Sequence, residues 1–230
     1  MDAIILAGGF GTRLKDVIGD IPKPLALING IPFLDILISK LQSDAKIENI
    51  ILSVGYKKEK IMGRYKNLKN IQFCEEDSPL GTGGAIKKGL KTAGSQNVLI
   101  LNGDTYVDFN SNELLDFHSK KNADITVLSN KIENVSRYGS LKIDPKTKRI
   151  LSFDEKKEND KNVNGYINAG VYLMKKNVFD DFLFDSFSIE KDFFPHSISS
   201  KNIFSYQTSS FFIDIGTKES FLEAQKLIKF

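Results

Sequence analysis

A short stretch near the beginning of the sequence has the residue types needed to hold an anion. The apolar run AIILA (3–7) leads into GGFG (8–11), which is followed by Thr12 and Arg13. Glycine lets backbone amides approach phosphate oxygens closely, and a guanidinium can donate two parallel hydrogen bonds to one phosphate. The stretch therefore indicates a phosphate-binding loop at the carboxyl end of a first strand. A structural turn is the alternative that its composition leaves open.

Two common phosphate-binding motifs do not fit this stretch. The dinucleotide motif G-x-G-x-x-G, counted from Gly9, requires a third glycine where Leu14 stands. The P-loop motif, counted from Gly8, requires its second glycine where Arg13 stands, and no Lys-Ser/Thr pair follows. What remains is G-G-x-G-T-R, a different kind of anion-binding loop.

Two further charged residues stand in settings that suit phosphate chemistry. Lys23 lies between Pro22 and Pro24, whose fixed φ angles leave its ammonium little slack, as a catalytic point charge requires. Asp104 follows the apolar run NVLILNG (97–103) and precedes a predicted helix, so its carboxylate is expected in the ligand crevice of an open α/β sheet. A turn or helix-cap aspartate is the alternative for Asp104.

The elements that must position these residues follow from the spacing of apolar side chains. In the first 130 residues the runs that predict strands are 3–7, 50–55, 97–104 and 123–129, and the amphipathic stretches that predict helices are 32–42, 57–66, 82–93 and 111–121. Ser111 or Asn112 is the expected N-cap of the last helix. This alternation predicts an α/β fold: a single Rossmann-like domain whose mostly parallel mixed sheet has helices on both faces.

The pattern changes after about residue 130. It predicts a hairpin around Asp144 and Pro145, a strand over 165–174, a capped helix from 188, two short strands within 202–216 and a closing amphipathic helix from 218. Neither a linker nor an internal repeat divides the two halves, so one domain over 1–230 is expected.

Composition excludes several classes of partner. The 32 basic and 29 acidic residues leave a net charge of +3 without a clustered basic excess, which argues against nucleic acid binding. There is no apolar run of the roughly 20 residues that a membrane span needs, and no signal-peptide pattern, so a cytoplasmic protein is expected. The one cysteine, Cys74, precludes an intrachain disulfide and is expected to pack in a strand. His118 and His196 match no metal spacing and are interpreted as structural or surface residues.

Taken together, the motifs resemble the sugar-1-phosphate nucleotidyltransferases. LAGGFGTRL (6–14) with PKPL (22–25) is similar to the signature of that family, and SPLGTGGAI (78–86) is similar to its nucleobase loop. The remaining similar stretches follow in the family's order: LNGD (101–104), SRYGSL (136–141), FDEKK (153–157), INAGVYLM (167–174), SIEKDFFP (188–195) and FIDIGTKESF (212–221). The resemblance covers nearly the whole chain and implies a nucleotide-binding half over about 1–130 and a sugar-phosphate-binding half over about 131–230.

The resemblance also implies roles for individual residues. In the family reaction the phosphate of a sugar 1-phosphate attacks the α-phosphorus of a nucleoside triphosphate, and pyrophosphate leaves. The implied nucleotide-binding residues are Leu6, Ala7, Gly8, Gly9, Gly11, Thr12, Arg13, Pro79, Gly81 and Thr82, and the implied catalytic residues are Arg13, Lys23 and Asp104. Tyr56 resembles a position near the nucleotide, with a packing role as the alternative.

The implied sugar-phosphate residues are Gly139, Glu155, Lys156 and Asn168. Glu155 and Lys156 lie in a charged run, so a solvated loop is their alternative. Asp104 and Asp214, each directly after an apolar run, are the implied ligands of a Mg²⁺ cofactor, with phosphate and water at its other positions.

Phe10 and the loop SPLGTGGAI are most similar to short bacterial enzymes that transfer GMP from GTP to D-glycero-D-manno-heptose 1-phosphate. Mannose-1-phosphate guanylyltransferases are the nearest alternative, followed by thymidylyl- and cytidylyltransferases. A non-catalytic sugar-nucleotide-binding subunit is the remote alternative, because such a protein is expected to lose charged site residues that stand here. The partners implied are a nucleoside triphosphate and a sugar 1-phosphate, with a homo-oligomer left open.

Overall fold

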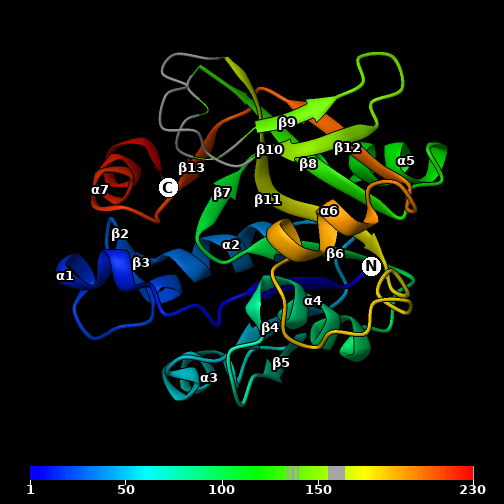
Figure 1. Ribbon diagram of the computed structural model, residues 1–230. Helices are drawn as coiled ribbons and strands as arrows, with labels where there is room; N and C mark the ends of the chain where they lie inside the picture. Colours follow the sequence, from blue (N-terminus) through cyan, green and yellow to red (C-terminus); the bar gives the residue numbers. More distant parts are fainter. Residues whose placement is uncertain (134, 136–137, 139, 155–163, 230) are drawn as a thin grey trace.

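A seven-stranded sheet forms the centre of the computed structural model, which describes residues 1–133, 135, 138, 140–154 and 164–229 (Figure 1). The strands are β1 (Ala3–Leu6), β4 (Ile50–Val54), β5 (Ile71–Glu75), β6 (Asn97–Asn102), β8 (Ile125–Ile132), β11 (Gly165–Lys175) and β12 (Ile203–Thr208). Across the sheet they follow the order β12, β8, β11, β6, β1, β4, β5. Neighbouring strands are parallel except where β11 pairs with β6 and β8. The predicted mostly parallel mixed sheet is confirmed.

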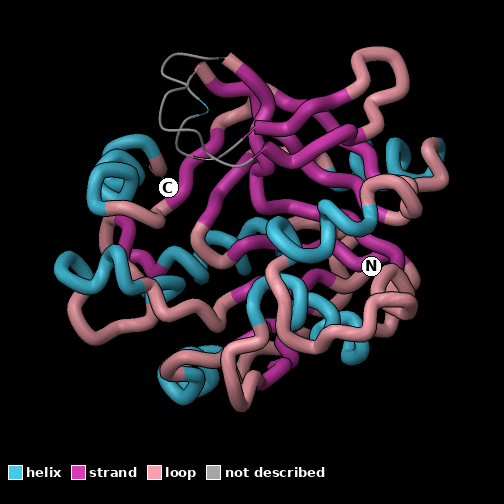
Figure 2. Tube along the Cα trace, in the orientation of Figure 1, coloured by secondary structure: helices cyan, strands magenta, loops and turns pink. Residues whose placement is uncertain are grey.

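The two faces of the sheet bury two separate groups of apolar side chains. Along β6, Leu99 and Leu101 belong to one group, and Val98 and Ile100 belong to the other. This division follows from the period of two in a strand, which sends successive side chains to opposite faces. Such strands are apolar on both sides because helices cover both faces, as the sequence predicts and as Figure 2 shows.

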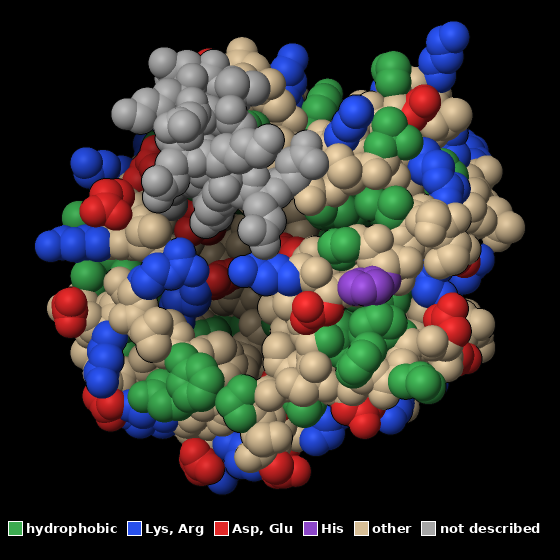
Figure 3. Space-filling model, viewed as in Figure 1, with side chains coloured by type: hydrophobic (Ala, Val, Ile, Leu, Met, Phe, Trp, Pro, Cys, Tyr) green, Lys and Arg blue, Asp and Glu red, His purple; other side chains and the backbone are tan. Residues whose placement is uncertain are grey.

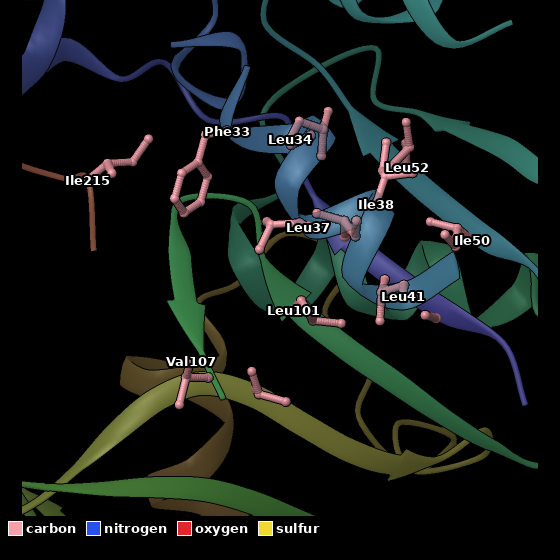
Figure 4. Packing of buried hydrophobic residues seen from close by; sticks show 14 of the residues in the cluster. Phe33, Leu34, Leu37, Ile38, Leu41, Ile50, Leu52, Leu101, Val107 and Ile215 are labelled. Carbon is pink, nitrogen blue, oxygen red and sulfur yellow. The ribbon is translucent and has the colours of Figure 1, made fainter. Parts of the chain in front are cut away.

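Helices divide between the two faces. One face is covered by α2 (Phe33–Gln42), α3 (Lys58–Tyr65), α5 (Ser111–Lys120) and α7 (Lys218–Leu227), and the other by α4 (Gly81–Thr92), the π-helix η4 (Ile189–Phe193) and α6 (Phe194–Ser197). In α2 the apolar residues repeat at helical spacing, so Phe33, Leu37 and Leu41 all face the sheet. Figure 4 shows this stripe packed against Leu52 of β4 and Leu101 of β6.

The helix α5 begins one residue earlier than the predicted caps imply. Asn110 is the N-cap, and its side-chain oxygen accepts hydrogen bonds from the backbone N–H of Asn112 at 2.9 Å and of Glu113 at 3.3 Å. The prediction of Ser111 or Asn112 was wrong because all three residues have capping side chains. Only Asn110 has the extended backbone, with φ −99° and ψ 114°, that an N-cap requires.

Three small two-stranded sheets lie outside the central one. They pair β2 (Leu27–Ile28) with β3 (Ile31–Pro32), β7 (Thr105–Val107) with β13 (Phe212–Asp214), and β9 (Ser140–Ile143) with β10 (Ile150–Asp154). The predicted hairpin at 144–145 is present as β9 and β10. The strand β7 was not predicted: Asp104 was expected to lead into a helix, but β7 lies between it and α5.

One expectation about a single residue agrees with the fold. Cys74 is buried in β5, as expected for a packed strand residue. Among the residues described, no helix combines the length and the hydropathy needed to cross a bilayer.

His118 should make the stability of this protein depend on pH. It is buried in α5, where its Nδ1 lies 2.8 Å from Thr126 Oγ1, and burial lowers its pKa to about 4 from the ordinary value of 6.5. Between these two pH values, His118 is therefore protonated in the unfolded chain and neutral in the folded chain. The contribution of neutral His118 to the free energy of unfolding is fully present above pH 6.5 and is lost as the pH falls toward 4. At pH 5 this loss is about 2 kcal/mol.

Urea unfolding of wild type and of His118→Gln at pH 7 and pH 5 measures this loss. Glutamine keeps a hydrogen-bonding side chain without a titratable group, so the variant should lose about 2 kcal/mol less than wild type over this interval. Equal losses in the two proteins would show that His118 does not cause the pH dependence.

Candidate active site

A cleft of about 480 Å³ opens at the carboxyl ends of β1, β4 and β6. Figure 3 shows this face of the molecule hollowed, with basic and acidic side chains around the hollow. The predicted site residues in its lining are Leu6, Gly8, Gly9, Gly11, Lys23, Pro79, Gly81, Thr82 and Asp104. A larger groove of about 750 Å³ runs between the end of α2 and the start of α5, and none of the predicted catalytic, substrate-binding or metal-binding residues lines it. The smaller cleft is therefore the candidate active site, because it holds the groups that suit phosphate chemistry.

At two positions of the glycine loop, an added side chain would force a neighbouring residue to move. A Cβ on Gly8 would lie 2.7 Å from Glu76 Oε1, and a Cβ on Gly11 would lie 2.9 Å from the Cβ of Lys23. Gly11 also has a φ of +62°, in the left-handed region that favours glycine. The loop thus brings bare backbone directly against Lys23.

Lys23 and Asp104 form an ion pair inside the cleft. Lys23 begins the short 3-10 helix η2 (Lys23–Leu25), and its Nζ donates to Asp104 Oδ2. The other carboxylate oxygen of Asp104 accepts from Thr105 Oγ1 at 3.2 Å. Lys23 is 17% exposed and Asp104 32%, so both charges remain accessible from the cleft while partly shielded from solvent. The structure brings together two of the three predicted catalytic groups.

Arg13 and its neighbours lie beside the cleft rather than in its lining. Arg13 is exposed and belongs to the 3-10 helix η1 (Thr12–Leu14), which continues into α1 (Lys15–Ile18). Ala7 is buried, and its backbone N–H donates to Ser53 at 2.8 Å. Ala7 thus ends the strand that carries the loop.

Asp214 stands next to Asp104 because β13 pairs with β7. Asp214 lies opposite Thr105 in this ladder, and the N–H of Ile215 donates to the carbonyl of Asp104 at 2.9 Å. The Asp214 carboxylate accepts from Gly216 N–H at 2.7 Å and also from the Tyr138 hydroxyl. The β7–β13 ladder thus brings the backbones of two residues that are 110 positions apart in the sequence next to each other.

Asp104 lines the cleft and Asp214 does not, so only the Asp104 carboxylate is placed where a divalent cation could also meet substrate. Carboxylate oxygens are the ligands that Mg²⁺ takes, and Mg²⁺ is usually bound by one or two carboxylates together with phosphate and water. Among the described residues there is no group of three or more His, Cys, Asp or Glu side chains that could hold a metal. Asp104, with Asp214 next to it, would therefore act with substrate oxygens rather than as part of a closed protein cage.

The predicted nucleobase loop is tied to the segment around Phe187. Gly81 has a φ of +71°, and a Cβ there would lie 2.5 Å from the Phe187 carbonyl oxygen. A Cβ on Gly83 would lie 2.1 Å from the Phe187 ring. Thr82 Oγ1 accepts from the N–H of Ile189 at 3.0 Å. Glycine is required here by packing, and Thr82 lines the cleft while it also holds η4.

An acidic wall of the cleft was missed at the sequence level. Glu76 and Asp77 line the cleft just before the loop, and Ser78, the first residue of the loop, lines it as well. Glu76 is held by Ser53 Oγ, which donates to its Oε1 at 3.0 Å, and by Leu80 N–H, which donates to its Oε2 at 3.4 Å. The three consecutive acidic residues EED (75–77) could have indicated an acidic wall in the sequence. The alternation of side chains along β5 does not show which of these carboxylates points into the cleft.

Asn168 is occupied by contacts within the protein. Its Nδ2 donates to the Tyr172 hydroxyl at 2.7 Å and to Glu190 Oε1 at 2.9 Å, while its Oδ1 accepts from Gly170 N–H at 3.0 Å. The register of β11 against β8 shifts between Asn168 and Val171, and such bulges re-aim side chains next to active sites. The other predicted sugar-phosphate residues, Gly139, Glu155 and Lys156, lie outside the described residues.

Comparisons with known proteins agree with this geometry. Residues 2–229 match the model of the family described as Nucleotidyl transferase. The D-glycero-alpha-D-manno-heptose 1-phosphate guanylyltransferase of Aneurinibacillus thermoaerophilus is 36% identical over 98% of this chain and 97% of its own length. The protein of the same name from Campylobacter jejuni is 38% identical over 96% and 97%. The crystal structure of HddC from Yersinia pseudotuberculosis complexed with GMP-PN is 36% identical with a TM-score of 0.87 and covers 99% of both chains. This chain therefore belongs to the nucleotidyl transferase family, as a sugar-1-phosphate nucleotidyltransferase.

Proposed function

We propose that this enzyme joins GTP to D-glycero-α-D-manno-heptose 1-phosphate, giving GDP-heptose and pyrophosphate. The observation that carries the proposal is the cleft itself, which places the glycine loop and the Lys23–Asp104 pair beside an acidic wall. The names of the relatives from Aneurinibacillus thermoaerophilus and Campylobacter jejuni support the choice of base and sugar.

The proposed reaction is a single displacement at phosphorus. A phosphate oxygen of the sugar 1-phosphate forms a bond to the α-phosphorus of GTP, and the bond from that phosphorus to the oxygen bridging to the β-phosphate breaks. The electron pair leaves on pyrophosphate. Such a reaction needs positioning and charge stabilisation more than covalent help from the protein.

The residues of the cleft divide this work. Bare amides of the glycine loop bind phosphate oxygens, and the Lys23 ammonium offsets charge at the α-phosphate and the attacking phosphate. Arg13, next to the loop, binds the leaving pyrophosphate. Mg²⁺ held by Asp104 and Asp214 would supply further charge neutralisation between the two anionic substrates.

The acidic wall supports guanine as the base. An ionised carboxylate is only a hydrogen-bond acceptor, and guanine presents N–H donors on its N1 and N2 atoms. Glu76, whose orientation is set by Ser53 and Leu80, and Asp77 offer such acceptors beside the predicted nucleobase loop. Thymine has a single N–H donor flanked by carbonyl groups, so two carboxylates suit it less well.

A matrix of nucleoside triphosphates against sugar 1-phosphates tests the proposal by pyrophosphate release. GTP with D-glycero-α-D-manno-heptose 1-phosphate should have the highest kcat/KM. If dTTP or CTP exceeds GTP by about tenfold, equivalent to about 1.4 kcal/mol, the assignment of guanine is wrong. If mannose 1-phosphate exceeds the heptose by the same margin, the assignment of the sugar is wrong. Absence of pyrophosphate with every pair would favour a non-catalytic sugar-nucleotide-binding protein.

A further inference from the structure

The glycine loop carries one side chain, and that side chain rests on another aromatic ring. In the four residues Gly8–Gly11, only Phe10 has a side chain. The ring of Phe10 lies 5.2 Å from the ring of Tyr56, centroid to centroid, with the planes tilted by 45°. Both residues line the cleft, and Phe10 remains 55% exposed. A large apolar side chain is therefore kept at the surface of the site instead of in the core.

Tyr56 is a firm support for this contact. It lies two residues after the end of β4, and its backbone N–H donates to the Gly8 carbonyl at 3.2 Å. The next residue, Lys57, places its Nζ 5.1 Å from the centre of the Tyr56 ring and pairs with Asp20. The end of β4 is thus fastened to the loop on one side and to the segment that leads into Lys23 on the other.

The middle of the loop has fewer restraints than its two ends, where Gly8 and Gly11 pack against neighbouring residues. A Cβ built on Gly9 meets nothing within 4 Å, so open space surrounds this residue. Glycine has more backbone freedom than any other residue, and a loop that must present its amides to phosphate loses that freedom on binding. A contact that holds the loop beforehand lowers this cost, and an aromatic pair contributes about 0.5–1.5 kcal/mol beyond its buried area.

We propose that Phe10 is a positioning residue, which holds the glycine loop in its phosphate-binding conformation through its contact with Tyr56. This inference rests on the proposed function, in which the loop binds a nucleoside triphosphate. It predicts that the contact acts before the nucleotide arrives. A ring that only touched the bound nucleotide would have no effect on the loop in the ligand-free protein.

Hydrogen exchange and nucleotide binding together test the proposal. In ligand-free Phe10→Ala and Tyr56→Ala, the amides at positions 14 and 56, which donate to the carbonyls of Gly11 and Gly8, should exchange faster than in wild type. The Kd for GTP, measured by calorimetry, should rise between about twofold and about tenfold in each variant. The double variant should bind no more weakly than the weaker single variant, because both changes remove the same contact. The KM for GTP should rise in the same variants, and by a larger factor than kcat falls, because bound phosphates hold the loop once substrate is saturating.

Phe184→Ala is the matched control. Phe184 is also an exposed aromatic residue, at 67%, and its ring lies 5.4 Å from that of Phe182, away from the cleft. This variant should leave both the exchange of the amides at positions 14 and 56 and the Kd unchanged. Phe10→Tyr should restore wild-type behaviour, and Phe10→Leu serves if the alanine variant does not fold.

Unchanged exchange of the amides at positions 14 and 56 in Phe10→Ala overturns the inference, whatever happens to binding. The inference is also overturned if the double variant raises the Kd by the product of the two single effects, because that result shows two independent contacts. Exchange is measured without nucleotide, so it does not depend on which triphosphate the enzyme uses. If wild type binds no GTP but the exchange still responds, the choice of base fails and the positioning role stands.

Discussion

Replacing Lys23 by alanine should lower kcat by about 100-fold to 1000-fold, the usual effect of removing one group that stabilises transition-state charge. The Lys23 ammonium is held in the cleft by Asp104, between two prolines that restrict its backbone. Arg13→Ala should have a similar effect, because the guanidinium is assigned to the leaving pyrophosphate. Steady-state pyrophosphate release under saturating substrates measures both.

Arg13→Lys separates charge from geometry. A lysine keeps the charge but cannot reproduce the two parallel hydrogen bonds of a guanidinium, so rescue should be incomplete. Lys40→Ala is the control for Lys23, since Lys40 forms a comparable ion pair with Asp108 outside the cleft. Near-normal turnover in both Lys23→Ala and Arg13→Ala would remove these two residues from the mechanism.

Asp104→Asn and Asp214→Asn should each lose most Mg²⁺-dependent turnover and shift the metal optimum upward. Asparagine has nearly the same shape but lacks the charge that attracts the cation. The fold should survive both changes, because an amide oxygen can still accept from Thr105 at Asp104 and from Gly216 at Asp214. Activity against Mg²⁺ concentration, together with the binding of Mn²⁺ measured by electron paramagnetic resonance, checks the prediction.

Asp108→Asn is the matched control for the metal prediction. Asp108 lies directly after β7 and pairs with Lys40, so it is an aspartate of the same region that does not line the cleft. This variant should keep the wild-type dependence on Mg²⁺. If Asp214→Asn also keeps it, Asp214 is a structural residue of the turn before α7, and Asp104 acts with substrate oxygens alone.

Local sequence was sufficient for most of the architecture. Apolar runs such as NVLIL (97–101) predict strands buried on both faces, and the apolar spacing of 33, 34, 37, 38 and 41 predicts α2. The glycine loop and Lys23 could also be recognised, because their chemistry depends on neighbours within a few residues. Short elements were harder: β7 has three residues, and so brief a strand forms only because β13 supplies a partner.

The long-range contacts of the site were decided by tertiary structure. Asp104 and Asp214 both follow apolar runs, but only the β7–β13 ladder makes them neighbours. The sequence predicts a helix over 82–93, which its glycines weaken, whereas the structure shows that Gly81 and Gly83 allow close packing of this helix against Phe187.

The amide of Asn168 shows the same limit. Sequence similarity implies a role at the sugar phosphate, and the structure adds that this amide donates to Tyr172 and to Glu190, which lies on η4. The physical reason is that hydrogen-bond partners and packing distances depend on segments that meet only after folding. Periodicity and motif spacing describe each segment by itself, so they determined which groups this protein has, and the fold decided which of them meet in the cleft.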